Sequence, residues 1–247
     1  MTPAALGPTL VGILALCAVS VGVLSLARIP QWWAPFTAVA RAAVQLAAIG
    51  LILSGVITDI VWVALALLVM LSVAIATSTH RLGWSTRHVL VVASAIVGGA
   101  AATLLVVFGS GALAPTPRYL LAIGGIVIGN TMAITTLTAR RFLQAVGEQW
   151  DQVEGWLALG AGPVDATRAL ARSAVHAALV PSIDQTKTTG LVTLPGAFVG
   201  AVFGGLSPLE AGRFQVVVLA AILTAGTIAA VLVVRLLGDV QRRPLGP

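Results

Sequence analysis

Charged side chains are scarce in this sequence. Two pairs of polar residues, beside or within its apolar segments, have spacings that would place both side chains on the same side of a helix. Arg41 and Gln45 are four residues apart, so they share one face of a helix. Asp184 and Lys187 are three apart, which suits a local ion pair. If these segments cross a membrane, such charges are costly and usually face a bundle interior or water. Both pairs are therefore candidates for a solute pathway or gate, with structural pairing as the alternative and, for Arg41, extension to the membrane surface.

A third polar group lies within the apolar segment 119–138. It consists of one amide and four hydroxyls: Asn130, Thr131, Thr135, Thr136 and Thr138. Such groups either form hydrogen bonds between helices, each worth about 1 kcal/mol or less, or line a permeation path. Asn130 and Thr131 are the pathway candidates.

Small residues recur along another apolar segment. Gly196, Gly200 and Gly204 form a G-x-x-x-G-x-x-x-G row. Because small residues let helices approach closely, we expect this row at a helix-packing surface, with a dimer seam or pathway wall as further options. Pro195 is expected to begin or kink that helix.

Enzymatic chemistry finds little support in the sequence. The histidines His80, His88 and His176 lie outside the apolar segments, where they suit cationic anchoring at a membrane surface. There is no H-E-x-x-H motif or cysteine cluster for zinc, and no G-x-x-x-x-G-K-[ST] loop for ATP. Cys17 is the single cysteine and is expected to be a small core residue. No catalytic residue is assigned, and a metal site stays unknown.

The overall composition indicates a polytopic membrane protein. Hydrophobic residues make up 58% of the 247 residues and charged residues 9%, whereas about a quarter are charged in soluble domains. Seven apolar segments suit membrane-spanning helices: 5–27, 34–57, 60–77, 89–109, 119–138, 188–204 and 214–237. Barrel strands would alternate polar and apolar residues, and these runs do not. We expect an all-α bundle of about seven transmembrane helices in a single membrane domain, 1–247.

Lysine and arginine predict the orientation. With the N-terminus outside and the C-terminus inside, the outer side holds only Arg118 and Arg213. The inner side holds eleven cations: Arg28, Arg81, Arg87, Arg140, Arg141, Arg168, Arg172, Lys187, Arg235, Arg242 and Arg243. This asymmetry follows the positive-inside rule and explains the net charge of +6 without a nucleic-acid partner. We expect a multi-pass protein of the cell membrane, the plasma membrane of a prokaryote.

The longest polar stretch, 139–187, is expected to be a cytoplasmic loop with helical content. Its apolar residues recur at i, i+3, i+4 and i+7, at Val153, Trp156, Leu157 and Gly160. This spacing predicts a helix over about 150–160. Gly160 and Gly162 can end that helix, and Pro163 can begin a second one.

The second helix of this loop carries a basic stripe. Arg168, Arg172 and His176 follow one another at four-residue intervals. On pattern alone, the two short helices could lie on lipid headgroups, so membrane lipid is an expected partner.

A short motif in the first helix has a known counterpart. Glu154-Gly155-Trp156, followed after three residues by Gly160, resembles the EAA-x-x-x-G loop of ATP-binding-cassette (ABC) permeases, with glycine and tryptophan for the two alanines. In that family the loop is a coupling helix that docks into the ATPase subunit. The resemblance implies ATPase-coupling roles for Glu154, Trp156, Leu157 and Gly160.

Other motifs between about residues 38 and 236 resemble the FetB-type branch of that superfamily. They are Arg41-x-x-x-Gln45-Leu46, Gly129-Asn130-Thr131-Met132, Pro181-Ser182-Ile183-Asp184, Lys187, Gly190-Leu191-Val192, Leu194-Pro195-Gly196 and Arg213-Phe214-Gln215. The match adds Met132 to the pathway candidates. Members are described as iron exporters that work with a separate ATPase, and a plant branch is linked to aluminium tolerance and nucleotide-sugar transport. After Leu-Pro-Gly the family often has methionines and polar residues. This chain instead has Ala197, Phe198, Val199 and Ala201, so soft metal donors are missing there.

The resemblance implies the permease subunit of an ABC transporter that exports iron, another metal ion or a metal-linked solute. This chain is then no enzyme and binds no cofactor, because ATP and Mg belong to a cytoplasmic ATPase partner. Seven spans are few for a transport pathway, so a second copy of the chain is expected. The alternatives are a permease for a small organic or nucleotide-sugar solute, and a non-transporting membrane anchor that recruits a cytoplasmic partner.

Overall fold

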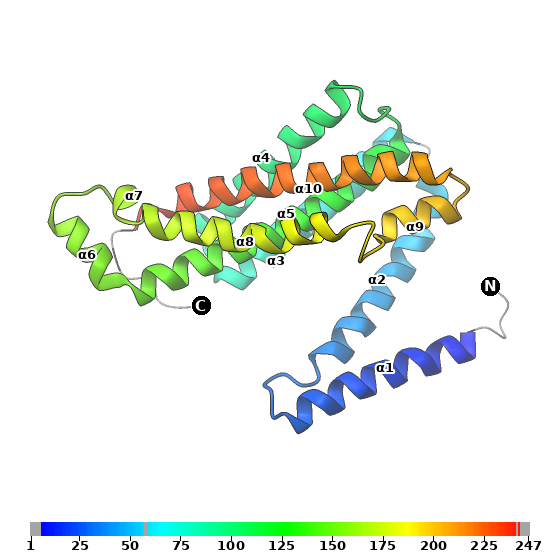
Figure 1. Cartoon of the computed structure of the whole chain (residues 1–247), viewed down its shortest axis with the longest axis horizontal. Helices are drawn as coiled ribbons and strands as arrows, with labels where there is room; N and C mark the ends of the chain where they lie inside the picture. Colours follow the sequence, from blue (N-terminus) through cyan, green and yellow to red (C-terminus); the bar gives the residue numbers. More distant parts are fainter. Residues whose placement is uncertain (1–5, 57–58, 241, 243–247) are drawn as a thin grey trace. The chain divides into compact units, whose positions relative to one another are not determined.

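The computed structural model describes residues 6–56, 59–240 and 242, and the regular structure of these residues is helical. Figure 1 shows the ten helices in chain order. The chain divides into two compact units, Met1–Ile57 and Thr58–Pro247.

The N-terminal unit is a helical hairpin. Helices α1 (Leu6–Leu26) and α2 (Ala34–Val56) pack against each other across a short turn. Cys17 is buried where this turn folds back, in an apolar cavity that it shares with Trp32 and Trp33. The expectation that Cys17 is a small core residue is confirmed.

Four long helices build the second unit: α3 (Ile60–Leu82), α4 (Thr86–Gly109), α5 (Pro117–Glu148) and α10 (Pro208–Leu237). Each begins at a side chain that accepts a hydrogen bond from a backbone N–H of the first turn, namely Asp59, Ser85, Thr116 and Ser207. Such caps satisfy donors that a helix leaves unpaired at its start. These residues therefore determine where the long helices begin.

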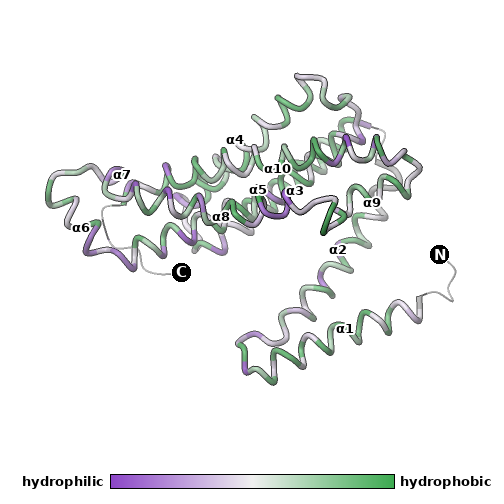
Figure 2. The backbone as a smooth tube through the Cα atoms, in the orientation of Figure 1, coloured by the Kyte–Doolittle hydropathy of each residue, from purple (hydrophilic) through white to green (hydrophobic). Residues whose placement is uncertain are grey.

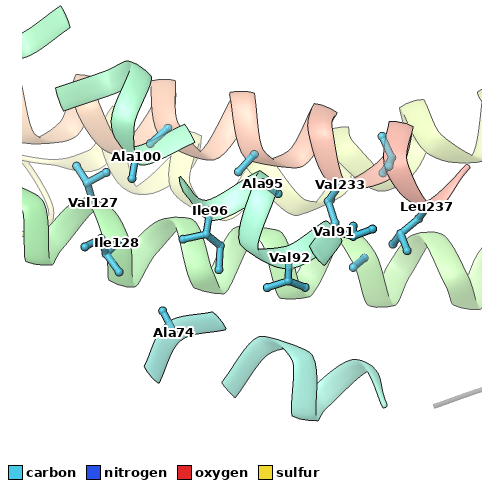
Figure 3. Packing of buried hydrophobic residues seen from close by; sticks show 14 of the residues in the cluster. Ala74, Val91, Val92, Ala95, Ile96, Ala100, Val127, Ile128, Val233 and Leu237 are labelled. Carbon is cyan, nitrogen blue, oxygen red and sulfur yellow. The ribbon is translucent and has the colours of Figure 1, made fainter. Parts of the chain in front are cut away.

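Small side chains let α4, α5 and α10 pack closely. The side chains labelled in Figure 3 belong to one buried cluster contributed by α3, α4, α5 and α10, in which Ala95, Ile96 and Val127 are fully buried. A Cβ at Gly99 would lie 2.5 Å from the carbonyl oxygen of Ala225, and a Cβ at Gly226 would clash with the side chain of Ile134. The bundle core therefore depends on glycine and alanine, as is common between membrane helices.

Membrane-spanning character is confirmed for this fold. Among the described residues, five helices are long and apolar enough to cross a membrane, namely α1, α3, α4, α5 and α10, and Ala34–Gly50 is a shorter apolar helix. Exposed apolar side chains such as Leu65, Leu68 and Val69 cover the outside of α3, as expected where a helix faces lipid. The predicted all-α polytopic bundle is confirmed, whereas the number of about seven spans and the orientation stay predictions.

The remaining helices differ from the expected loop and sixth span. After α6 (Trp150–Ala158) and α7 (Pro163–Ala166), the 21-residue helix α8 (Arg168–Thr188) packs along α5 and α10 (Figure 1). The segment 188–204 is not a continuous span, because it contains a turn and the eight-residue helix α9 (Gly196–Phe203).

The break between α8 and α9 has local causes. Gly190 has φ of +90°, a conformation that side chains with a Cβ rarely adopt, and Pro195 has no N–H to continue a helix. Four backbone N–H groups of the turn, from Gly190 to Thr193, donate to carbonyl oxygens within the same turn. α8 and α9 are therefore two separate helices, and each packs beside α10.

Candidate functional site

The helix predicted over about 150–160 is present as α6, and two of its large apolar side chains are exposed. Its ATPase-coupling role stays a prediction. Val153 is buried and fixes α6 to the rest of the unit. Trp156 is 51% exposed and Leu159 is 81% exposed, whereas Leu157 is half-buried. α6 therefore presents a tryptophan and a leucine to its surroundings, the kind of side chains that anchor a helix in a groove.

Gly160 forms the corner after α6. The N–H of Gly160 donates to Leu157 O and the N–H of Ala161 donates to Trp156 O, the pattern that ends many helices at a glycine. The φ of Gly160 is +89°, and nothing lies within 4 Å of the position that a Cβ would take. The glycine is thus required by backbone conformation and not by lack of space.

Charged groups flank this corner. Glu154 is exposed, and no ion pair involves it in the described part of the chain. On the other side of the corner, Asp165 of α7 pairs with Arg168 at the start of α8. Glu154 therefore remains available as a polar contact beside Trp156.

The second half of α8 is polar although it lies beside apolar helices. The hydroxyl of Thr167, just before α8, donates to Pro163 O at 2.9 Å and lies 3.5 Å from Gly238 O. The start of α8 therefore lies at the end of α10, and Figure 1 shows that the two helices run antiparallel. Asp184 lies about 26 Å further along α8, near the level of Ala221 within the apolar part of α10. Figure 2 shows the hydrophilic end of α8 against these hydrophobic helices.

Asp184 and Lys187 form the predicted local ion pair. Their side-chain atoms Oδ1 and Nζ are 3.3 Å apart, and the side chains are 60% and 69% exposed, respectively. The pair is therefore on the outer face of α8, away from the core of the unit. The role of this pair as a gate stays a prediction.

The polar residues of α5 have different surroundings from one another. Asn130 donates to Ile126 O within its own helix at 2.8 Å. Thr136 shares a 2.7 Å hydrogen bond with Ser78 of α3. This is the hydrogen bonding between helices that was one of the two expected roles of these polar residues. Thr131 and Thr135 are fully buried, and their hydroxyls have no partner among the described protein atoms. The described chain therefore buries these threonines in its core, whereas Asn130 is only partly buried.

Asn130 and Asp184 nevertheless share a level along the bundle. Ile134 packs where a Cβ of Gly226 would be, so Asn130, one helical turn before Ile134, lies near residue 222 of α10. Met132 packs against the core, and Arg41 and Gln45 are exposed on α2 of the N-terminal unit.

The glycine row of α9 is open within this chain. Nothing lies within 4 Å of the Cβ positions of Gly196 and Gly200, and Gly204 meets only backbone of its own helix. The predicted close packing is therefore not made by the described part of this chain. The same residues contain no group of three or more His, Cys, Asp or Glu that could hold a metal ion, and the metal site stays unassigned.

Similarity to known proteins agrees with a membrane permease. The model of the uncharacterised protein family UPF0014 matches residues 8–240. The chain belongs to this family. It is 38% identical to the UPF0014 membrane protein STAR2 of Oryza sativa subsp. japonica, over 79% of this chain and 69% of that protein.

Two further relatives extend the comparison. The chain is 35% identical to Protein ALUMINUM SENSITIVE 3 of Arabidopsis thaliana, over 78% of this chain and 71% of that protein. It is also 35% identical to the Probable iron export permease protein FetB of Escherichia coli (strain K12), over 56% of this chain and 53% of that protein. No solved structure matches the chain. The family and the apolar helices establish a FetB-type, multi-pass membrane protein.

Sequence reasoning missed Leu159 and the position of α8. Leu159 directly precedes the glycine corner, so its sequence position was a usable signal. The packing of α8 against α5 and α10 had no comparable local signal, because the mixed polar and apolar sequence of α8 resembles that of a surface helix.

Proposed function

We propose that this chain is the permease subunit of an ABC transporter, which exports iron, another metal ion or a metal-linked solute. ATP is hydrolysed in this proposal by a separate cytoplasmic ATPase that binds the nucleotide and Mg. Membership of the family and the relative named as an iron export permease support the transport class.

The observation that carries the ATPase coupling is the exposed corner formed by α6 and Gly160. A short helix with a buried anchor at Val153 and exposed Trp156 and Leu159 has the features of a helix that docks into a partner groove. Glu154 beside them would orient the helix on the partner. A helix serving only to close the fold would bury these two large side chains instead.

The polar face of α8 supports a second copy of the chain. Exposed Asp184 and Lys187 at the depth of apolar α10 would be costly against lipid, so water or protein should cover them. The turn between α8 and α9 also carries exposed Leu191 (92%) and Val192 on non-helical backbone, which does not face lipid at membrane depth. In a homodimer, the two α8 faces would form the walls of one solute pathway.

The side chains on the α8 faces favour a solute in which any metal ion is already bound by an organic ligand. One carboxylate and one ammonium from each copy would face the pathway at this depth, and the described residues contain no cluster of metal donors. The same observation favours the second candidate, a permease for a small organic or nucleotide-sugar solute.

The test is co-purification of the permease with its cognate ABC ATPase, followed by solute-stimulated ATP hydrolysis in proteoliposomes. We expect Trp156→Ala combined with Leu159→Ala, and separately Glu154→Lys, to leave the permease folded while ATPase retention and stimulation fall. The control is Arg168→Ala, which breaks an exposed ion pair with Asp165 and leaves α6 unchanged. If both sets of variants keep full ATPase binding and stimulation, α6 is a membrane-surface helix and the coupling proposal is wrong.

A further inference from the structure

A groove with a charged rim lies between α8 and the last turns of α10. Its volume is about 650 Å³. The floor is aliphatic, with Val175 and Leu179 from α8 and Val231 and Val234 from α10. A groove of this size and lining can hold part of a hydrocarbon chain.

The rim of this groove is cationic. Arg168, Arg172 and His176 contribute from α8, and Arg235 contributes from α10. Arg168 is partly neutralised by its ion pair with Asp165. No ion pair involves Arg172 or Arg235 among the residues that the structure describes. Two exposed guanidinium groups from different helices therefore flank the groove without a carboxylate partner.

The position of the groove combines these two features at a membrane boundary. Arg235 lies in the last turn of α10, directly after the continuous apolar sequence of this membrane-spanning helix. The aliphatic floor therefore extends from the charged end of α10 toward its apolar part. A ligand that fits would carry its negative charge at the helix end and its apolar part toward the bilayer.

We propose that this groove binds an anionic phospholipid, with its phosphate between Arg172 and Arg235 and an acyl chain along Val175, Leu179 and Val231. Arginine matches phosphate with paired N–H donors, which makes it suited to this contact. Basic pockets between membrane helices on the cytoplasmic side are recognised sites for anionic lipid headgroups.

Charge and polarity distinguish this occupant from others. An acidic peptide could meet the arginines, but it would leave its backbone donors and acceptors against the aliphatic floor, where they cannot be paired. A free phosphate would use the rim and leave the floor empty. The site does not depend on the proposed transport function, because it requires only that α10 cross the membrane.

Lipid binding by the purified full-length chain tests the proposal. Detergent-solubilised protein is titrated with phosphatidylglycerol and, separately, with phosphatidylcholine of the same acyl chains, and bound lipid is counted by native mass spectrometry. We expect one phosphatidylglycerol per chain to be retained, with clearly weaker retention of phosphatidylcholine. Inorganic phosphate is the probe for the rim alone, and it should compete only weakly.

Two kinds of variant locate the site. Arg172→Gln with Arg235→Gln should weaken phosphatidylglycerol binding about 30-fold, since each arginine near the membrane surface contributes about fivefold. The matched control is Arg140→Gln with Arg141→Gln, which removes two exposed charges of α5 that do not line the groove. A third variant, Leu179→Trp, fills the floor without changing charge and should also weaken binding.

Several outcomes would overturn the inference. Equal retention of both lipids would mean a hydrocarbon groove without headgroup recognition. Equal losses in the two double variants would mean general electrostatic attraction, and strong competition by phosphate would mean a soluble anion site. Unchanged binding in Arg172→Gln/Arg235→Gln with a normal size-exclusion profile would place the lipid elsewhere. A cross-link between two copies through position 172 that excludes lipid would make the groove a protein interface.

Discussion

The corner at Gly160 allows a graded test of the coupling proposal. Its φ of +89° lies in the left-handed region, and a Cβ placed there meets nothing within 4 Å. A substitution therefore acts through backbone conformation alone. We expect Gly160→Val to disfavour the observed corner by about 1–2 kcal/mol, because side chains with a Cβ resist positive φ and branched ones resist it most.

That free energy translates into a population change at the corner. A cost of about 1–2 kcal/mol lowers the population of the observed conformation about 5- to 30-fold. The helix bundle should not unfold, because Val153 is the one residue of α6 that is fully buried among those described. The expected result is a folded, membrane-inserted permease whose α6 is misdirected.

The assay is solute-stimulated ATP hydrolysis by the reconstituted complex, with the thermal midpoint of the permease measured in parallel. Gly160→Asn is the matched variant, because asparagine tolerates positive φ better than valine. Stimulation should fall strongly for valine and less for asparagine, with both midpoints close to wild type. Equal activity of the two variants, or a lowered midpoint that explains the loss, would refute the conformational argument.

Three further predictions concern the bundle, the pathway and the orientation. Gly226→Val should lower the free energy of unfolding by about 1–3 kcal/mol through overpacking, measured by thermal unfolding, whereas Gly129→Val should not, because nothing lies within 4 Å of its Cβ. Asp184→Asn should reduce solute export in proteoliposomes with little change in stability, since the carboxylate is exposed in the single chain; unchanged export would remove it from the pathway. In a Cys17→Ala background, Asp165→Cys should react with an impermeant thiol reagent only after cells are opened, and labelling of intact cells would contradict the inside position of α7.

The corner of α6 could be predicted because its signals are local. A helix over about 150–160 was predicted from apolar residues at helical spacing and from the helix-ending sequence Gly160-Ala161-Gly162-Pro163. The observed helix α6 spans Trp150–Ala158. Caps and glycines act through bonds to neighbours a few residues away, so the sequence itself contains the relevant information. Leu159 was missed because it lies at the end of the helix, outside the repeating pattern.

The course of α8 and α9 could not be predicted from hydropathy. A polar helix was assigned to the cytoplasm and an apolar run, 188–204, to the membrane. Packing against α5 and α10 places polar α8 beside the apolar bundle, while Gly190 and Pro195 interrupt the apolar run. Hydropathy is averaged over a window of consecutive residues, so it contains no information about which other helices will pack against a segment.

The two ends of α8 set different requirements on what surrounds the protein. At membrane depth, a charged side chain on a helix costs about 2.5–3.5 kcal/mol on insertion scales, and a local pair between Asp184 and Lys187 offsets only part of that cost. Contact with water or with a second chain can remove the remaining free-energy cost, whereas contact with lipid tails cannot. At the other end, Arg172 of α8 and Arg235 in the last turn of α10 flank the groove, so an anionic lipid headgroup can supply their partner. One helix can therefore face a solute pathway with its far half and a lipid with its near half, because its charges lie at two different depths.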